Sequence, residues 1–177
     1  MVSAELPNEF KIVDLARNLA RRYDHELVLL ANTIPLVKYT VDDILADNKD
    51  EKRLYGKWIH GLVVLWGDEV VGFVSAYERI SERNEQYPTN TLYISELAIS
   101  KKHRGKGVAT VLMERFFKKN SKIGMRVIGG ELNYSLQTNS ADWNKPVIDF
   151  YFSLGFLVQS EKFYSNRVDL VLRRSEE

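Results

Sequence analysis

The chain has 177 residues, of which 45% are apolar, and a formal net charge of +1. A chain of this length can bury one well-packed core, so we expect a single domain over residues 1–177. The balanced charge argues against a protein whose main partner is a polyanion, because such domains carry a basic excess. The absence of cysteine excludes a disulfide framework, a thiolate metal site and a cysteine nucleophile.

The histidines and the apolar runs also restrict the class of protein. His25, His60 and His103 are scattered and form no metal-ligand constellation. The first ten residues lack the basic start and apolar core of a signal peptide. The longest apolar runs, such as residues 62–66, are too short to cross a bilayer. We therefore expect a cytoplasmic protein with no membrane partner and no metal.

The first third of the chain predicts a short strand followed by two helices. Residues 9–13 fit a strand, and Asp14 fits the N-cap of the helix that follows. Thr40 fits the N-cap of a second helix, which should end near Asp47. The acidic residues between positions 42 and 51 either attract a cationic substrate or form a solvated helix start and loop.

The middle of the chain predicts a hairpin, a loop and a third strand. Residues 58–66 and 69–80 are strand-like and meet at Gly67-Asp68, a two-residue hairpin signal. Residues 81–90 either border the substrate site or form an ordinary surface connection. Residues 91–100 alternate partly and are rich in β-branched and aromatic residues, which favours a strand.

A basic glycine loop, residues 101–107, precedes an amphipathic helix over residues 108–120, which Asn120 would cap. The first turn of a helix leaves backbone N–H groups without partners, and its dipole adds about half a positive charge. Gly105 and Gly107 let a ligand approach the backbone closely. The loop therefore predicts a phosphate-binding site, although its spacing fits neither the Walker A motif nor G-x-G-x-x-G.

The last third predicts a strand, a connection, a helix and a hairpin. Glycines inside the strand suggest a bulge or a splay. An asparagine fits the N-cap of the helix, and a glycine fits its end. In order, these elements are residues 125–132 with Gly129-Gly130, residues 134–143, the helix from Asn144 to Gly155, and the hairpin of residues 156–164 and 167–173.

Two motifs resemble those of the GNAT superfamily of N-acetyltransferases. Residues 104–109 resemble its pyrophosphate loop, R/Q-x-x-G-x-G/A, and residues 96–99 resemble its fourth strand. Residues 144–156 resemble N-x-x-A-x-x-F-Y-x-x-x-G-F, with Val147 in place of the usual alanine. The resemblance covers about residues 62–173. It implies an α/β GNAT fold, with a mixed, mostly antiparallel central sheet of about six or seven strands, about four flanking helices and a splay between the fourth and fifth strands.

The resemblance also implies acetyl-CoA as the cosubstrate. Its pyrophosphate would lie on the glycine loop, and its pantetheine arm would enter the opening between the splayed strands. Asn144 either contacts this arm or only caps its helix. The cofactor contacts implied are the main chain of Leu97, Ala98 and Ile99, the loop residues Arg104, Gly105, Lys106, Gly107, Val108 and Ala109, and the helix residues Asn144 and Tyr151.

The catalytic groups are only partly assigned. The resemblance makes Tyr151 the general acid that protonates the coenzyme A thiolate, and a phenol with an ordinary pKa near 10 stays protonated at neutral pH. Family practice leaves the base open, and we expect a water chain that ends on Glu96 or Glu131. Period two puts Tyr93 and Ser95 on one face of their strand and Glu96 on the other, unless a bulge intervenes.

The leading hypothesis is an N-acetyltransferase in which a primary amine attacks acetyl-CoA directly through a tetrahedral intermediate. The alternative is a non-catalytic acetyl-CoA-binding sensor or interaction module. Tyr151 and Asn144 favour the enzyme, because a sensor needs neither. RNA binding through residues 101–106 is disfavoured by the balanced charge and the lack of an aromatic platform. The acceptor, a small-molecule or peptide amine, and the formation of a homodimer stay open.

Overall fold

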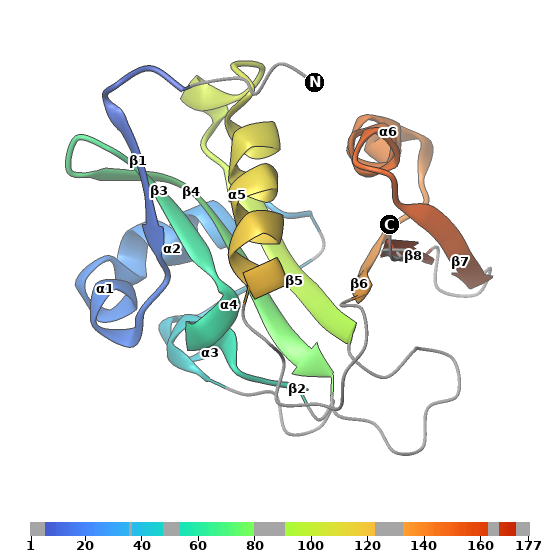
Figure 1. The fold of residues 1–177 in the computed structure, drawn as a ribbon, viewed down its shortest axis with the longest axis horizontal. Helices are drawn as coiled ribbons and strands as arrows, with labels where there is room; N and C mark the ends of the chain where they lie inside the picture. Colours follow the sequence, from blue (N-terminus) through green and yellow to red (C-terminus); the bar gives the residue numbers. More distant parts are fainter. Residues whose placement is uncertain are drawn as a thin grey trace.

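A computed structural model describes residues 6–35, 37–47, 54–79, 91–122, 133–162 and 167–172. Their strands form one sheet in the order β1-β3-β4-β5-β6-β8-β7, with β2 paired to β4 (Figure 1). The strands are β1 (Phe10–Asp14), β2 (Leu54–Tyr55), β3 (Leu62–Trp66), β4 (Glu69–Arg79), β5 (Thr91–Ile99), β6 (Asn133–Asn139), β7 (Leu157–Lys162) and β8 (Arg167–Leu172). The helices are α1 (Arg17–Arg22), α2 (Asp24–Ala31), α3 (Val41–Leu45), α4 (Lys57–His60), α5 (Val108–Lys122) and α6 (Lys145–Ser153), and the 3-10 turns are η2 (Lys101–His103) and η3 (Asp142–Asn144).

The sheet opens between β5 and β6. These two strands are parallel and pair only at residues 91–93 with 133–135, whereas every other pair of strands is antiparallel. Strand β6 then continues along β8 through residue 139, and β5 continues along β4 through residue 99. Figure 1 shows β6, α6, β7 and β8 set to one side of β1 to β5. The mixed, mostly antiparallel sheet with a splay is therefore confirmed.

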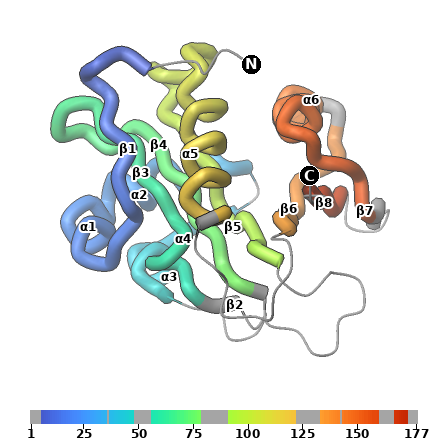
Figure 2. The backbone as a smooth tube through the Cα atoms, viewed as in Figure 1, coloured from blue at the N-terminus to red at the C-terminus, as the bar shows by residue number. Residues whose placement is uncertain are grey.

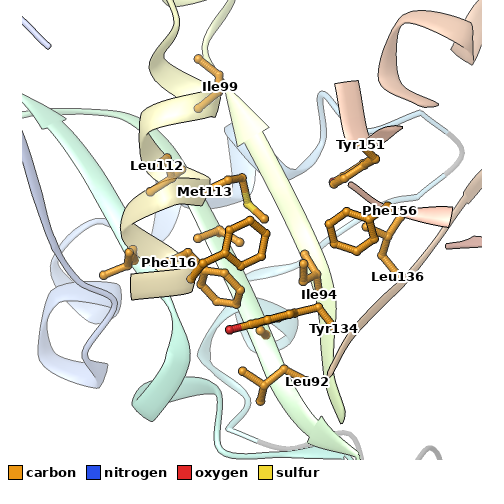
Figure 3. Close-up of a cluster of buried hydrophobic side chains, with 14 of the residues drawn as sticks. Leu92, Ile94, Ile99, Leu112, Met113, Phe116, Tyr134, Leu136, Tyr151 and Phe156 are labelled. Carbon is orange, nitrogen blue, oxygen red and sulfur yellow. The ribbon is translucent and has the colours of Figure 1, made fainter. Parts of the chain in front are cut away.

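Helices cover both faces of the sheet. Leu112 and Phe116 of α5 pack with Leu92 and Ile94 of β5 on one face (Figure 3). Helices α1, α2 and α3 lie on the other face and contribute a second apolar cluster, which includes Ala98 of β5. Burying a large apolar side chain stabilises the fold by about 1.5–3 kcal/mol, so these two clusters fix the sheet between its helices.

The N-terminal segment supplies the first strand, because β1 pairs with β3 over residues 10–14 (Figure 2). The predicted N-cap at Asp14 is wrong. Asp14 ends β1, and its carboxylate lies 2.8 Å from the Lys119 ammonium, while α1 begins at Arg17. The predicted cap at Thr40 is confirmed by a capping box with Asp43, although α3 ends at Leu45, before Asp47.

Two predictions around β3 and α5 need correction, and both concern one buried contact. The first part of the expected strand 58–66 is the helical turn α4, in which His60 is buried. Its Nδ1 lies 2.7 Å from Asn120 Oδ1, and its Nε2 lies 2.9 Å from Glu78 Oε1. Asn120 therefore does not cap α5: its amide also donates to the Phe116 carbonyl at 2.9 Å, inside a helix that runs to Lys122.

In the last third, the connection expected at residues 134–143 is mostly strand β6, because Tyr134 and Leu136 both face the core that α5 covers. Asn144 makes no side-chain cap on α6, which is a further correction. Gly155 ends that helix at φ +92°, and the antiparallel pair β7–β8 follows as predicted. The loop 81–90, the strand 125–132 with its glycine pair, and the turn 163–166 lie outside the described residues.

Candidate active site

The glycine loop ends where α5 begins, and its main chain faces open space. Gly105 and Gly107 have φ values of +72° and +77°, which favour glycine. A Cβ atom at either position would meet nothing within 4 Å. The backbone N–H groups of residues 105–110 donate to no described residue, and the first bond of the helix runs from Val111 N to Gly107 O at 3.1 Å. The loop therefore has the donors and the room that a phosphate group needs.

The basic side chains of the loop differ in their contacts. Lys106 is exposed beside the open N–H groups, as are Lys101 and Lys102. Arg104 instead donates through Nε to the Ile99 carbonyl at 2.8 Å and through Nη2 to Thr33 Oγ1 at 3.2 Å. Arg104 therefore joins the end of β5 to the segment after α2.

His103 lies in the basic loop, but its side chain is buried and supports the loop from within the protein. It is buried, with Nδ1 2.7 Å from Ser100 Oγ, and its ring packs edge-on against Phe10 at a centroid distance of 5.7 Å. The side chain thus anchors η2 to β1 and fixes where the following glycines begin.

The main chain of β5 between Leu97 and Ile99 pairs with β4 on one edge only. Beyond Tyr93, no described strand pairs with its other edge. The side chains of Leu97 and Ile99 pack toward α5, and Ala98 packs toward α1 to α3. An edge strand presents N–H and C=O groups in a row, so this stretch can pair with an amide-bearing chain.

Tyr151 and Asn144 lie on the other side of the splay. Tyr151 is buried, and its ring lies 5.4 Å from that of Phe156 (Figure 3). Burial raises the pKa of the Tyr151 phenol above its ordinary value, and nearby Tyr93 raises it further. Asn144 is also buried and donates from Nδ2 to Thr138 Oγ1 at 2.7 Å and to the Asn139 carbonyl. It thereby fastens the start of α6 to the end of β6.

A bulge in β5 determines where Glu96 points. Ser75 and Ala76 of β4 are consecutive, but they pair with Glu96 and Ile94, which leaves Ser95 as the extra residue. Glu96 consequently lies on the face of Tyr93, the arrangement that strict period two excludes. Its side chain is 3% exposed.

Two serine hydroxyl groups hold the Glu96 carboxylate. Ser75 Oγ donates to Oε2 and Ser95 Oγ donates to Oε1 at 2.6 Å, and the Tyr39 phenol lies near enough for the carboxylate to raise its pKa. Tyr77 is fully buried on the same face. We call these residues, Tyr39, Ser75, Tyr77, Ser95 and Glu96, the acceptor cluster.

Burial and Glu96 together set the chemistry of the tyrosines in the acceptor cluster. Burial raises the pKa of the Tyr39 phenol, and the charge of Glu96 and a hydrogen bond to it raise that pKa further. Burial likewise raises the pKa of Tyr77, with Glu96 as the next cause. Both phenols therefore remain protonated at neutral pH and can donate but not act as bases.

Sequence reasoning missed Tyr39, Ser75, Tyr77 and Ser135. Ser135 pairs with Tyr93 at the last parallel pair of the splay; it is 1% exposed, and its hydroxyl has no hydrogen-bond partner among the described residues. None of the four belongs to a motif. No sequence pattern pointed to them, and the bulge that turns Glu96 onto the face of Tyr93 was considered only as an exception to period two.

Of the other candidates, Asp43 and Asp47 lie near enough to the acceptor cluster for their charges to raise the pKa of Tyr77 further. The Asp43 carboxylate accepts from Thr40 N and Oγ1, each at 2.8 Å, so this acid belongs to the capping box of α3. Asp50, Glu51 and Glu131 lie outside the described residues. Within the described ranges, no group of three His, Cys, Asp or Glu residues is arranged to hold a metal ion. No helix among the described residues has the length and hydropathy needed to span a bilayer.

The splayed sheet and the open glycine loop before α5 are the two features that define the class of this fold. The model of the acetyltransferase (GNAT) family matches residues 33–156. This is more than half of the chain, so the protein belongs to that family and is an acyltransferase. No curated protein matches the sequence.

Solved structures share the fold at low sequence identity. Ard1 from Thermoplasma volcanium has a TM-score of 0.65 and 20% identity, covering 93% of this chain and 97% of its own. YncA from Salmonella typhimurium, solved with acetyl-CoA, has a TM-score of 0.65 and 16% identity, covering 96% of both chains. Naa50 from Arabidopsis thaliana, solved with the bisubstrate analogue CoA-Ac-MVNAL, has a TM-score of 0.63 and 16% identity, covering 94% of this chain and 99% of its own.

Proposed function

We propose that this chain, as a single domain over residues 1–177, moves the acetyl group of acetyl-CoA to a primary amine. The amine attacks the thioester directly, and the reaction passes through a tetrahedral intermediate. The observation that carries the proposal is the parting of β5 from β6 after Tyr93, next to a helix start whose N–H groups face open space. The absence of cysteine from the chain is consistent with direct attack.

The glycine loop would hold the pyrophosphate of the cofactor. The donors are the N–H groups of Gly105, Lys106, Gly107, Val108 and Ala109, and the Lys106 ammonium adds charge. A hydrogen bond to a charged group is worth about 1.5–3 kcal/mol. The free edge of β5 at Leu97, Ala98 and Ile99 would pair with the pantetheine amides, with Asn144 and Tyr151 across the splay.

The catalytic roles follow from protonation. Tyr151 keeps its proton because burial raises its pKa, so it can donate to the leaving thiolate as a general acid. Glu96 would be the final proton acceptor, because an ionised carboxylate can accept from all the hydroxyls that surround it. The amine acceptor is a small molecule or a peptide N-terminus, and the Naa50 complex supports the fold's capacity for a peptide.

A thiol-release assay tests the proposal. Acetyl-CoA is incubated with the protein and a panel of polyamines, amino acids, aminoglycosides and peptides, and free thiol and N-acetyl product are both measured. We expect amine-dependent release, and about a 10²-fold lower kcat for Glu96→Gln. Binding of acetyl-CoA without release for any amine would instead support a sensor.

A further inference from the structure

The chain that connects α2 to α3 is tied to the glycine loop by the side chain of Arg104. The guanidinium donates from Nε to the Ile99 carbonyl at 2.8 Å and from Nη2 to Thr33 Oγ1 at 3.2 Å. We infer that Arg104 is a positioning residue for the acceptor amine, because it holds residues 32–35 and 37–39, which we call the cover segment. This inference rests on the proposed function and gives Arg104 a role other than contact with the cofactor phosphate.

The cover segment lies on the face of the sheet that carries Glu96. Its Ile34 and Tyr39 pack against the apolar cluster that includes Ala98 of β5. Ala98 and Glu96 are two residues apart, in a stretch where the pairing with β4 is regular, so both lie on this face. An amine that reaches Glu96 on this face would therefore lie beside the cover segment.

The start of the glycine loop gives Arg104 a fixed origin. Ser100 N donates to a carbonyl of β4 at 2.8 Å, and His103 N donates to the Ser100 carbonyl at 2.9 Å. His103 is buried, and its Nδ1 lies 2.7 Å from Ser100 Oγ. The bond from Arg104 Nε to the Ile99 carbonyl then orients the guanidinium. Both the backbone and the side chain of Arg104 are therefore anchored to the end of β5.

The Thr33 hydroxyl is arranged to accept from Arg104. Its own proton goes to the Leu30 carbonyl, 2.7 Å from Oγ1, which leaves the lone pairs of the oxygen for the guanidinium. Helix α2 ends at Ala31 and has no basic residue in its last turn. Arg104 therefore supplies, from a distant part of the chain, the positive charge that the C-terminal end of a helix favours.

Asn32 extends this support to the far end of the cover segment. Its Oδ1 accepts from Tyr39 N at 2.7 Å, and its Nδ2 donates to Tyr39 O at 3.1 Å. The two ends of the cover segment are thereby joined, and the next residue, Thr40, is fixed by the capping box of α3. The cover segment is therefore closed at its base, and Arg104 holds that base through Thr33.

Arg104 differs in this respect from Lys106, the basic residue two positions further on. Both side chains are exposed, but Lys106 makes no hydrogen bond or ion pair with the rest of the described chain, whereas Arg104 has two partners. A planar guanidinium can donate to two partners in fixed directions. A lysine at position 104 would keep the charge and lose this fork, so charge and positioning can be separated by mutation.

Arg104→Lys and Arg104→Ala test the positioning role, with Lys106→Ala as the matched comparison. We expect both Arg104 variants to raise the KM for the accepted amine about tenfold at saturating acetyl-CoA, and to leave the calorimetric Kd for acetyl-CoA within about twofold. Lys106→Ala should show the reverse, a higher Kd for acetyl-CoA and an unchanged KM for the amine. Adding Thr33→Val to Arg104→Ala should raise the KM no further, because both changes remove the same contact.

Hydrogen exchange gives a second measurement that needs no acceptor. The Ile34 amide donates to the Ala31 carbonyl at 3.0 Å, and the Tyr39 amide donates to Asn32. Both amides should exchange faster in Arg104→Ala than in the wild type, because the base of the cover segment has lost its support. Unchanged exchange at both amides would show that Arg104 does not hold the segment and would overturn the inference.

The kinetic outcomes separate this role from the proposed function. If the Kd for acetyl-CoA rises as much in Arg104→Ala as in Lys106→Ala, Arg104 is a phosphate contact and the inference is wrong. Independent, additive effects of Arg104→Ala and Thr33→Val on the KM would also overturn it. If the wild type releases no thiol with any amine, the proposed function fails and this role fails with it. An active wild type with an unchanged amine KM in Arg104→Ala removes only the role of Arg104.

Discussion

The two sides of the candidate site are built in different ways. The proposed phosphate site on the cofactor side is one continuous stretch, residues 101–109, and its donors belong mainly to the backbone. The acceptor cluster joins side chains from three segments, with Tyr39, Ser75 and Glu96 far apart in the sequence. Binding by backbone groups requires only the two glycines and the start of a helix, so it persists when other residues of the chain are changed. Side-chain chemistry depends on tertiary packing, so the two sides should respond differently to mutation.

The largest expected effect tests Tyr151, the proposed general acid. Tyr151→Phe should lower kcat by about 10²–10⁴-fold, because the leaving thiolate loses its proton donor. Acetyl-CoA affinity should hold, since the buried ring remains. Tyr134→Phe is the control, because Tyr134 is a fully buried tyrosine of the same core. Steady-state rates and calorimetric Kd values measured on both variants decide the matter. Equal kcat values for the two variants would make Tyr151 an ordinary core residue.

Gly107→Ala tests whether the cofactor side depends on the backbone. A methyl group at this position would meet nothing within 4 Å but would block the phosphate, so we expect the Kd for acetyl-CoA to rise about 10²-fold. Gly67→Ala is a close match, because Gly67 also has a positive φ, of +59°, and open space around its Cβ position. Equal affinities for acetyl-CoA in the two variants would contradict the assignment of the loop.

Unfolding at alkaline pH sharpens the comparison, because the acceptor cluster holds two tyrosines, Tyr39 and Tyr77, whose pKa values a carboxylate raises. Tyr77 keeps its proton in the folded state when the unfolded chain, with a pKa near 10, has lost it. Its contribution to stability is therefore complete below about pH 10 and is lost as the pH rises further. Each such tyrosine adds at most about 1.4 kcal/mol per pH unit to the slope.

Tyr77→Phe should make that slope shallower above pH 10 and leave it unchanged below pH 9. Denaturant unfolding at a series of pH values measures both parts. A slope above pH 10 that is the same in the variant and the wild type would show that the phenol titrates normally.

The smallest expected effect tests the contact between the two sides. Arg104 reaches from the glycine loop to Thr33, which is next to Asn32, whose side-chain amide hydrogen-bonds both main-chain groups of Tyr39. Thr33→Val removes this hydrogen bond, and we expect the KM for the acceptor to rise about twofold to tenfold. Thr33→Ser retains the hydroxyl and should behave as the wild type. If acetyl-CoA affinity changes more than the KM for the acceptor, the prediction that this contact affects acceptor binding is wrong.

The sequence predicted the glycine loop and the two elements beside it well, because their patterns are local. The strand at residues 91–99, the glycines at 105 and 107 and the helix from Val108 are contiguous, and each has its own pattern. The splay was also anticipated, but only through the family resemblance. Asn144 and Tyr151 were found by motif, although the side chain of Asn144 bonds back to β6 and does not cap α6.

Most of the acceptor cluster could not be predicted from the sequence, because its contacts join residues that are far apart in the chain. Tyr39 reaches Glu96 across more than fifty residues of sequence, and a single inserted residue, Ser95, turns Glu96 onto that face. Helix α4 and strand β6 were missed because buried polar partners and cross-strand pairs stabilise them against their local composition. Such partners become visible only when the chain has folded.

The most direct test of the account is one NMR measurement with acetyl-CoA labelled with ¹³C at the acetyl carbonyl. The labelled cosubstrate is mixed with excess enzyme, with and without the best amine from the panel. We predict that the thioester carbonyl signal is replaced by an amide carbonyl signal on the amine, only when the amine is present, and that no label appears on the protein. A thioester signal that persists with every amine, or a label that appears first on the protein, would contradict direct transfer.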